Sequence, residues 1–117
     1  MPEKRDETFS RENKLRSSSD FQRIFSRGKR IATANFVVYF LPNRLPVARL
    51  GIQVKARIGP ATRRNYIKRI VREVFRKMKL EFRTPLDLIF IAEKGMRELE
   101  YERFEIEFRK ALQICLR

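Results

Sequence analysis

Hydrophobic side chains recur every three or four residues between Ala61 and Lys79, which is the spacing of an amphipathic helix that lies on a core. The apolar stripe of this segment consists of Ile67, Ile70, Val71, Val74, Phe75 and Met78. At about 100° per residue, the opposite side carries Asn65, Lys68, Arg69, Arg72, Arg76 and Lys79. The segment therefore predicts a helix with one buried face and one cationic face.

The remaining hydrophobic pattern predicts two more helices and four strands. A short helix should run from Ser17 to Gly28, starting at a capping box formed by Ser17 and Asp20, and Thr62 should cap the cationic helix. The last segment carries apolar residues at helical spacing from Tyr101 to Cys115. Strands are expected over residues 31–32, 35–41, 49–57 and 86–92. The order α-β-β-β-α-β-α predicts an α/β sandwich with helices packed on a central four-stranded sheet.

The length and the distribution of apolar residues indicate one domain with an N-terminal extension. A chain of 117 residues can bury a single modest core. Residues 1–16 are polar and charged, with only Phe9 and Leu15 as apolar anchors, and this composition predicts a mobile basic arm. Residues 17–117 are predicted to form the single α/β domain.

Charge is concentrated in the part of the chain that contains the cationic helix. The formal net charge is +14, and Arg outnumbers Lys by 19 to 9. The segment from Arg49 to Lys79 carries eleven bases and one acid, whereas six acids balance six bases from Glu93 to Arg117. An ordinary solvated helix face would mix Glu with Lys. This local excess of arginine and lysine therefore predicts that the domain binds the phosphates of a nucleic acid.

The inventory of reactive side chains argues against catalysis by the chain itself. Histidine is absent, which removes the usual general base and metal ligand, and the acids form no sequence cluster for metal chemistry. Cys115, the only cysteine, lies on the apolar side of the last helix and is expected to be buried. We therefore predict no catalytic and no metal-binding residues. The absence of a long apolar run and of a signal-like N-terminus predicts a cytoplasmic protein without a membrane partner.

The cationic helix belongs to a longer motif, Gly59-x-Ala61-x-x-Arg64-Asn65-x-x-Lys68-Arg69-x-x-Arg72-Glu73, which Leu50-Gly51-Ile52-x-Val54 precedes. Together with Asp20-Phe21-Gln22-x-x-Phe25 and Phe36-Val37-x-Tyr39, it resembles the signature of the bacterial ribonuclease P protein component. The resemblance covers about residues 10–117. It implies a protein cofactor of a catalytic RNA that removes the 5′ leader from precursor tRNA, and Mg²⁺ that is bound mainly by RNA. It also implies an unusual left-handed β-α-β crossover around the cationic helix and no obligate protein partner.

The resemblance implies two RNA-binding surfaces. Matching motif positions assign the catalytic RNA to the cationic helix, with Arg76 continuing the same face: Arg64, Asn65, Lys68, Arg69, Arg72 and Arg76. The leader of precursor tRNA is assigned to a cleft between the first helix and the sheet: Phe21, Phe25, Phe36, Tyr39, Lys55 and Arg57. Phe21 and Phe25 fit a base-stacking platform or a plain core equally well, and for Phe36 the core is favoured. The chain has Ala56-Arg57 where the family usually has two consecutive basic residues, with a base moved to Lys55.

Two other classes of protein share some of these features. A non-enzymatic ribosomal or RNA-chaperone protein would have similar size, charge and aromatic content. A DNA-binding helix-turn-helix is disfavoured because no second helix precedes the cationic helix at a short turn.

Overall fold

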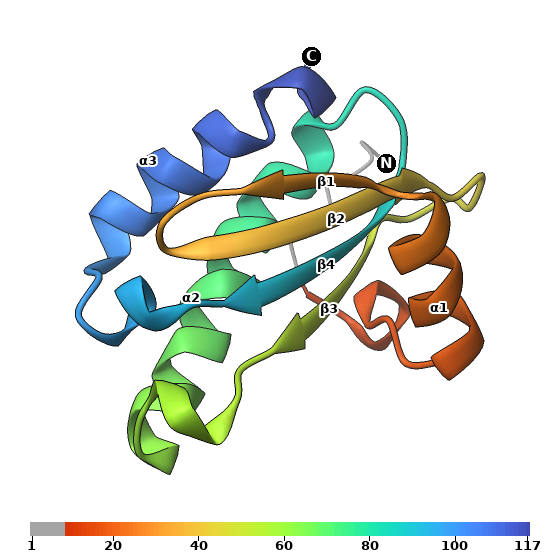
Figure 1. Ribbon diagram of the computed structural model, residues 1–117. Helices are drawn as coiled ribbons and strands as arrows, with labels where there is room; N and C mark the ends of the chain where they lie inside the picture. Colours follow the sequence, from red (N-terminus) through yellow and green to blue (C-terminus); the bar gives the residue numbers. More distant parts are fainter. Residues whose placement is uncertain (1–8) are drawn as a thin grey trace.

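A mixed four-stranded sheet with strand order β1-β2-β4-β3 forms the centre of the fold (Figure 1). Its strands are β1 (Lys29–Ala32), β2 (Phe36–Pro42), β3 (Arg49–Gln53) and β4 (Leu86–Ala92). β2 pairs with β1 and β4 in antiparallel fashion, whereas β3 runs parallel to β4. This computed structural model describes residues 9–117.

Helices cover both faces of the sheet, which confirms the α/β sandwich and the element order α-β-β-β-α-β-α (Figure 1). α2 (Ala61–Met78) and α3 (Tyr101–Ala111) pack on one face, and α1 (Ser18–Arg27) packs on the other face at one end of the sheet. Short 3₁₀-helices connect these elements at Arg11–Asn13, Ala56–Ile58, Lys79–Glu81, Lys94–Arg97 and Gln113–Cys115. No helix in residues 9–117 has the length and apolarity to span a membrane.

The alternation of side chains along β2 separates two hydrophobic clusters, because successive residues of a strand point to opposite faces. Phe36 and Val38 enter the larger cluster, which α2 and α3 close, and the Phe36 ring lies 5.2 Å from that of Phe90. Tyr39 packs in the smaller cluster under α1, around Ile24 and Ile89. The apolar stripe predicted for the cationic helix is buried in the larger cluster.

Several predicted element ends are wrong, and hydrogen bonds explain why. The Ser17–Asp20 capping box does not form, because the Ser17 hydroxyl bonds to that of Ser19 at 2.8 Å and the Asp20 carboxylate is taken by arginines. Pro60, and not Thr62, is the N-cap of α2. β3 ends before residue 57 because a 3₁₀ turn follows it. β3, α2 and β4 form the parallel β-α-β unit, whose left-handed crossover stays a prediction.

The first described residues are packed on the domain, so the prediction of a mobile arm is wrong for residues 9–16. Leu15 is 6% exposed, and its backbone N–H donates to the Leu50 carbonyl at 3.0 Å. The Asn13 amide donates to the Ala48 carbonyl at 2.8 Å, and the Phe9 ring meets Phe75 edge-on. These contacts fasten the segment along β3. The rest of the predicted arm, residues 1–8, lies outside the described residues.

Candidate nucleic-acid interface

The cationic face of α2 lies opposite its buried stripe along a helix of 18 residues, which corresponds to about 27 Å. Asn65 and Arg69 are exposed. The other predicted contact residues are half-buried along the same helix: Arg64, Lys68, Arg72 and Arg76. The structure therefore brings all six residues that were assigned to the catalytic RNA onto one helix with solvent access.

The side chains of this face differ in how they are held. Arg64 donates from Nε to the Gly59 carbonyl at 3.2 Å, which fixes it at the start of α2. Arg76 bonds to Glu73 at 2.6 Å, and this hydrogen bond lowers the pKa of the Glu73 carboxyl. Neither Lys68 nor Arg72 has a hydrogen-bond or ion-pair partner among residues 9–117. These two cations are consequently available to phosphates.

Tyr66, which was not among the predicted contact residues, adds an aromatic ring beside this face. The guanidinium of Arg69 lies 5.4 Å from the centroid of the Tyr66 ring, and that of Arg63 lies 4.9 Å from it. Arg63 also donates to the carbonyls of Met96 and Leu99 at 2.8 and 3.2 Å. Arg63 therefore helps to join α2 to the segment before α3, and is more than an additional solvated charge.

A groove of about 320 Å³ connects the cationic face of α2 with α1. Lys68 and Arg72 line it on the α2 side and Phe21 on the α1 side, with β3 between them. Gly51 makes this approach possible, because a Cβ atom at this position would lie 2.5 Å from Cζ of Phe21. Lys14 and Arg16 line the same groove, although the polar composition of residues 1–16 had predicted a mobile arm there and neither residue was expected in the site.

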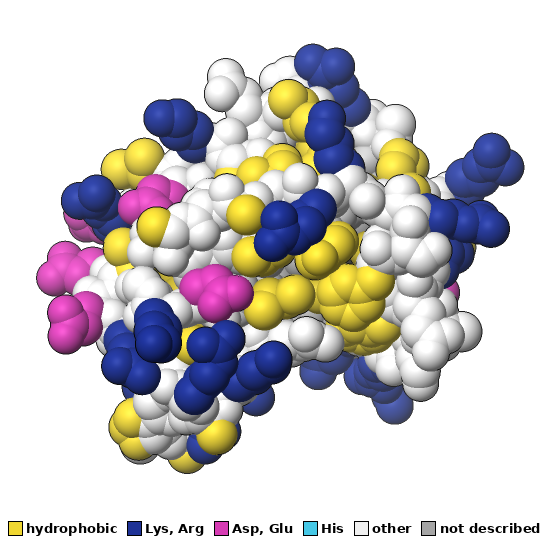
Figure 2. Space-filling view, viewed as in Figure 1, with side chains coloured by type: hydrophobic (Ala, Val, Ile, Leu, Met, Phe, Trp, Pro, Cys, Tyr) yellow, Lys and Arg dark blue, Asp and Glu magenta, His cyan; other side chains and the backbone are white. Residues whose placement is uncertain are grey.

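Aromatic rings continue this surface over the sheet, next to α1. Phe25 is 38% exposed, and its ring stands edge-on to Tyr39 with centroids 4.9 Å apart. Phe21 lies 6.3 Å from Phe25. In Figure 2, hydrophobic side chains gather between α1 and the sheet, and Lys and Arg side chains lie on both sides of them. We call Phe21, Phe25 and Tyr39 the aromatic platform.

Three residues of the predicted leader site lie elsewhere. Assigning Phe36 to this site is wrong, because its ring is fully buried on the opposite face of the sheet among Phe90, Phe104 and Phe108. Lys55 and Arg57 are exposed after the end of β3, outside the lining of the groove that contains Phe21. Arg57 forms an ion pair of 3.4 Å with Glu93.

A buried carboxylate fixes α1, which carries Phe21 and Phe25 of the aromatic platform, to the sheet. Asp87 in β4 is fully buried and accepts hydrogen bonds from Arg23 of α1 at 2.8 Å, from Arg49 of β3 at 2.7 and 2.8 Å, and from Asn43 at 2.9 Å. Burial by itself would raise the pKa of the Asp87 carboxyl, but these hydrogen bonds outweigh it and hold the pKa below its ordinary value. The sequence signal for this contact was the position of Asp87 within an otherwise apolar strand.

A basic helix with free cations, joined by a groove to exposed aromatic rings, defines a small nucleic-acid-binding protein. Cations neutralise phosphates, and aromatic faces accept bases of any sequence. The described residues contain no group of three or more acidic or cysteine side chains that could hold a metal ion. The geometry suits a protein that binds and positions a nucleic acid.

Comparison with known proteins identifies the family. The family model described as Ribonuclease P matches residues 9–116. The chain is 44% identical over 99 residues to the ribonuclease P protein component of Thermotoga maritima, covering 85% of this chain and 84% of that protein. It is 40% identical over 102 residues to that of Streptococcus agalactiae, covering 87% and 93%. The solved RNase P protein of Staphylococcus aureus superposes with a TM-score of 0.78 at 33% identity, covering 87% and 94%.

The chain belongs to the ribonuclease P protein component family. It is the protein cofactor of a ribonucleoprotein endoribonuclease that processes the 5′ ends of tRNA, in which RNA performs the catalysis, and it associates with the ribonuclease P RNA. This result confirms the resemblance and sets aside the ribosomal, RNA-chaperone and helix-turn-helix alternatives.

Proposed function

We propose that two adjoining surfaces of this protein bind the two RNAs of the reaction. The aromatic platform binds the single-stranded 5′ leader of precursor tRNA. The cationic face of α2 binds the catalytic RNA through Arg64, Asn65, Lys68, Arg69, Arg72 and Arg76. The observation that carries the proposal is the groove shared by Lys68, Arg72 and Phe21, because it places the phosphate-binding side chains next to the stacking side chains.

The platform suits a leader of variable sequence. Stacking of a base on an aromatic side chain contributes about 1–3 kcal/mol and tolerates any base. The exposed ring of Phe25 and the partly exposed ring of Tyr39 provide such faces, and Lys14 and Arg16 provide charge along the adjoining groove. The buried Asp87 contacts hold α1 in place, so the rings are positioned before the leader arrives.

The protein contributes electrostatics and position, and the metal belongs to the RNA. The acids next to the platform do not suit Mg²⁺, because Asp20 and Asp87 are both paired with Arg23 and Arg49. We place the Mg²⁺ ions on RNA phosphates. The role of Lys68 and Arg72 is to reduce repulsion between the two RNAs where the groove joins the two surfaces.

The assignment of α2 to the catalytic RNA is tested by changing Arg64, Lys68 and Arg69 together to alanine. A matched control changes Lys29, Lys94 and Lys110, which are exposed and lie outside both surfaces. Loss of three phosphate contacts should reduce the slope of log affinity against log salt by about 2.7, from about −5 for six contacts. The control should leave this slope almost unchanged. Equal weakening by both triple variants, on any RNA, would refute a specific surface.

We further infer that the protein acts in the cytoplasm and requires no second protein chain. Its single thiol, Cys115, is buried, and burial raises its pKa, which suits an unreactive residue of a reducing compartment. Reconstitution from the purified chain and the catalytic RNA tests whether a second protein chain is required. Light scattering should give one protein per RNA with full activity, and a need for an added protein would contradict it.

A further inference from the structure

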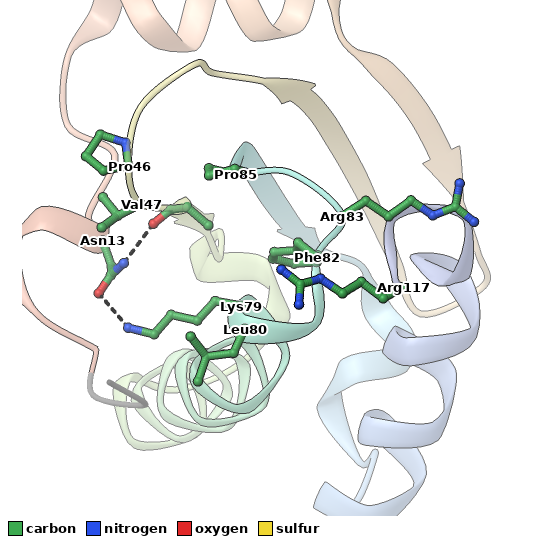
Figure 3. A pocket seen from close by; sticks show the side chains of 10 residues that line it. Asn13, Pro46, Val47, Lys79, Leu80, Phe82, Arg83, Pro85 and Arg117 are labelled. Carbon is green, nitrogen blue, oxygen red and sulfur yellow. Dashed lines mark hydrogen bonds between the residues drawn. The ribbon is translucent and has the colours of Figure 1, made fainter. Parts of the chain in front are cut away.

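A second cationic hollow, of about 320 Å³, lies outside the two surfaces proposed above (Figure 3). Its walls come from four parts of the chain: the N-terminal segment at Asn13, the loop at residues 46–48, the connection at residues 79–85, and Arg117. Asn13 turns into this hollow, whereas the following residues, Lys14 and Arg16, line the groove of the leader site. The two concavities therefore lie on either side of the same segment.

Hydrogen bonds between distant segments build these walls. The Asn13 side chain, which is 1% exposed, donates to the Ala48 carbonyl at 2.8 Å and accepts from Lys79 Nζ at 3.1 Å. The last residues pair with the connection, because the backbone N–H of Arg117 donates to the Glu81 carbonyl and that of Arg83 to the Cys115 carbonyl, both at 2.8 Å. The hollow is thus a fixed feature of the fold.

Among residues 9–117, the side chains that line the hollow are cationic or neutral. Lys79, Arg83 and Arg117 contribute three positive charges, and the remaining side chains are neutral. In Figure 3, the Arg117 side chain extends over the hollow past Phe82, Lys79 reaches toward Asn13, and Arg83 points away. None of the described residues pairs with the Arg117 guanidinium. An anion held near Lys79 and Arg117 would meet two donors from different walls.

We propose that this hollow binds a phosphate group of RNA, with the attached nucleoside against the apolar side chains of Pro46, Leu80 and Pro85. Cations beside an apolar wall match the two parts of a nucleotide, and the hollow is large enough for one. RNA is the occupant because the protein associates with RNA and the neighbouring groove lies across a single segment of chain. The phosphate comes from the catalytic RNA or from precursor tRNA. The site uses none of the residues assigned to the aromatic platform or to the catalytic RNA on α2; Lys79 is the C-cap of that helix.

The test uses the full chain with the charge at residue 117 reversed, Arg117→Glu, and a conservative variant, Arg117→Lys. Among residues 9–117, Arg117 makes hydrogen bonds only through its backbone, so we expect these substitutions to leave the fold intact. Lys110→Glu, on an exposed position of α3, makes the same change of charge away from the hollow. Lys79→Gln, whose amide can still donate to Asn13, probes the second cation. Affinity is measured for the catalytic RNA, and then for precursor tRNA binding to the assembled holoenzyme, over a range of salt concentrations.

Arg117→Glu should weaken binding about tenfold and reduce the salt slope by about 1. Lys79→Gln should reduce the slope similarly, and Arg117→Lys should restore most of the affinity. Weaker affinity for the catalytic RNA assigns the phosphate to that RNA. Weaker affinity for precursor tRNA alone assigns the phosphate to precursor tRNA. The proposal is overturned if Arg117→Glu and Lys110→Glu behave alike in both assays, or if Lys79→Gln and Arg117→Glu both leave the salt slope at its wild-type value.

Discussion

Replacing Asp87 by Asn should detach α1 from the sheet without removing a hydrophobic contact. The substitution keeps the size of the side chain but abolishes the charge that pairs with Arg23 and Arg49. Asp87 is fully buried between Arg23 and Arg49. Asp20 is partly exposed and forms ion pairs with the same two arginines, at 3.3 Å each. The change therefore tests whether one carboxylate fixes the helix that carries Phe21 and Phe25.

The size of the effect follows from the burial of the four groups. Removing one partner of a buried ion pair costs about 3–5 kcal/mol, because the other charge is left without compensation. Here the arginine side chains are 33% and 19% exposed, and Asp20 remains beside them. We therefore expect a loss at the low end, about 3 kcal/mol, out of a total of about 5–15 kcal/mol for a domain. Asp20→Asn, with a side chain 27% exposed, should cost less than about 1 kcal/mol.

Urea unfolding measures these free energies of unfolding. Fluorescence anisotropy measures the affinity of the assembled holoenzyme for precursor tRNA with and without its leader. Asp87→Asn should lower the unfolding midpoint and reduce the advantage that the leader gives to binding. Asp20→Asn should change both quantities little. If Asp87→Asn unfolds like the wild type and still distinguishes the two substrates, the claim that Asp87 anchors α1 is refuted.

Three further predictions follow from the same contacts. Tyr39→Ala and Phe25→Ala should each weaken binding of leader-containing precursor tRNA about tenfold, within the range of about 1–3 kcal/mol per stacked base, and leave binding of leaderless tRNA unchanged in the same anisotropy assay. Phe36→Ala should lower the free energy of unfolding by about 3–5 kcal/mol in urea titrations, without a selective loss of leader binding below its unfolding midpoint. Because the pKa of Asp87 is lower in the folded state than its ordinary value of 3.8, its stabilisation is present above that value and is lost as the pH falls through the folded pKa. Acid titration of stability should accordingly be steeper for the wild type than for Asp87→Asn below about pH 4.

Periodicity predicted α2 well because this helix is long and its two faces differ sharply. Each buried position from Ile67 to Met78 follows the period of 3.6 residues, and the cations fall on the other side by the same geometry. A long segment with this period leaves few alternatives to an amphipathic helix. The cationic half of the candidate interface could therefore be predicted from the sequence, apart from Tyr66.

The aromatic half could not be placed in the same way. Phe36 and Tyr39 were assigned to one cleft. They lie three positions apart on the same strand, so their side chains point to opposite faces of the sheet. Which face α1 would cover depends on the tertiary contacts of Asp87, and no local pattern reports them. Alternation along β2 separates the two residues onto opposite faces of the sheet but does not indicate which face α1 covers.

The prediction for the N-terminal segment was wrong for a related reason. Its low apolar content predicted mobility, yet the buried side chains of Asn13 and Leu15, together with the contact of Phe9 with Phe75, fasten it to the domain. Hydrogen bonds between side chain and backbone across 35 residues leave no periodic signal. Lys14 and Arg16 consequently entered the candidate site only when the fold was known.

The central claim, that the platform grips the leader while α2 holds the catalytic RNA, is tested most directly by cleavage of precursor tRNA at limiting Mg²⁺. The rate is measured with the catalytic RNA alone and with the protein added, on substrates with a long leader and with a leader of one nucleotide. We predict a large protein-dependent gain on the long leader that disappears on the short one. An equal gain on both substrates would contradict the leader assignment.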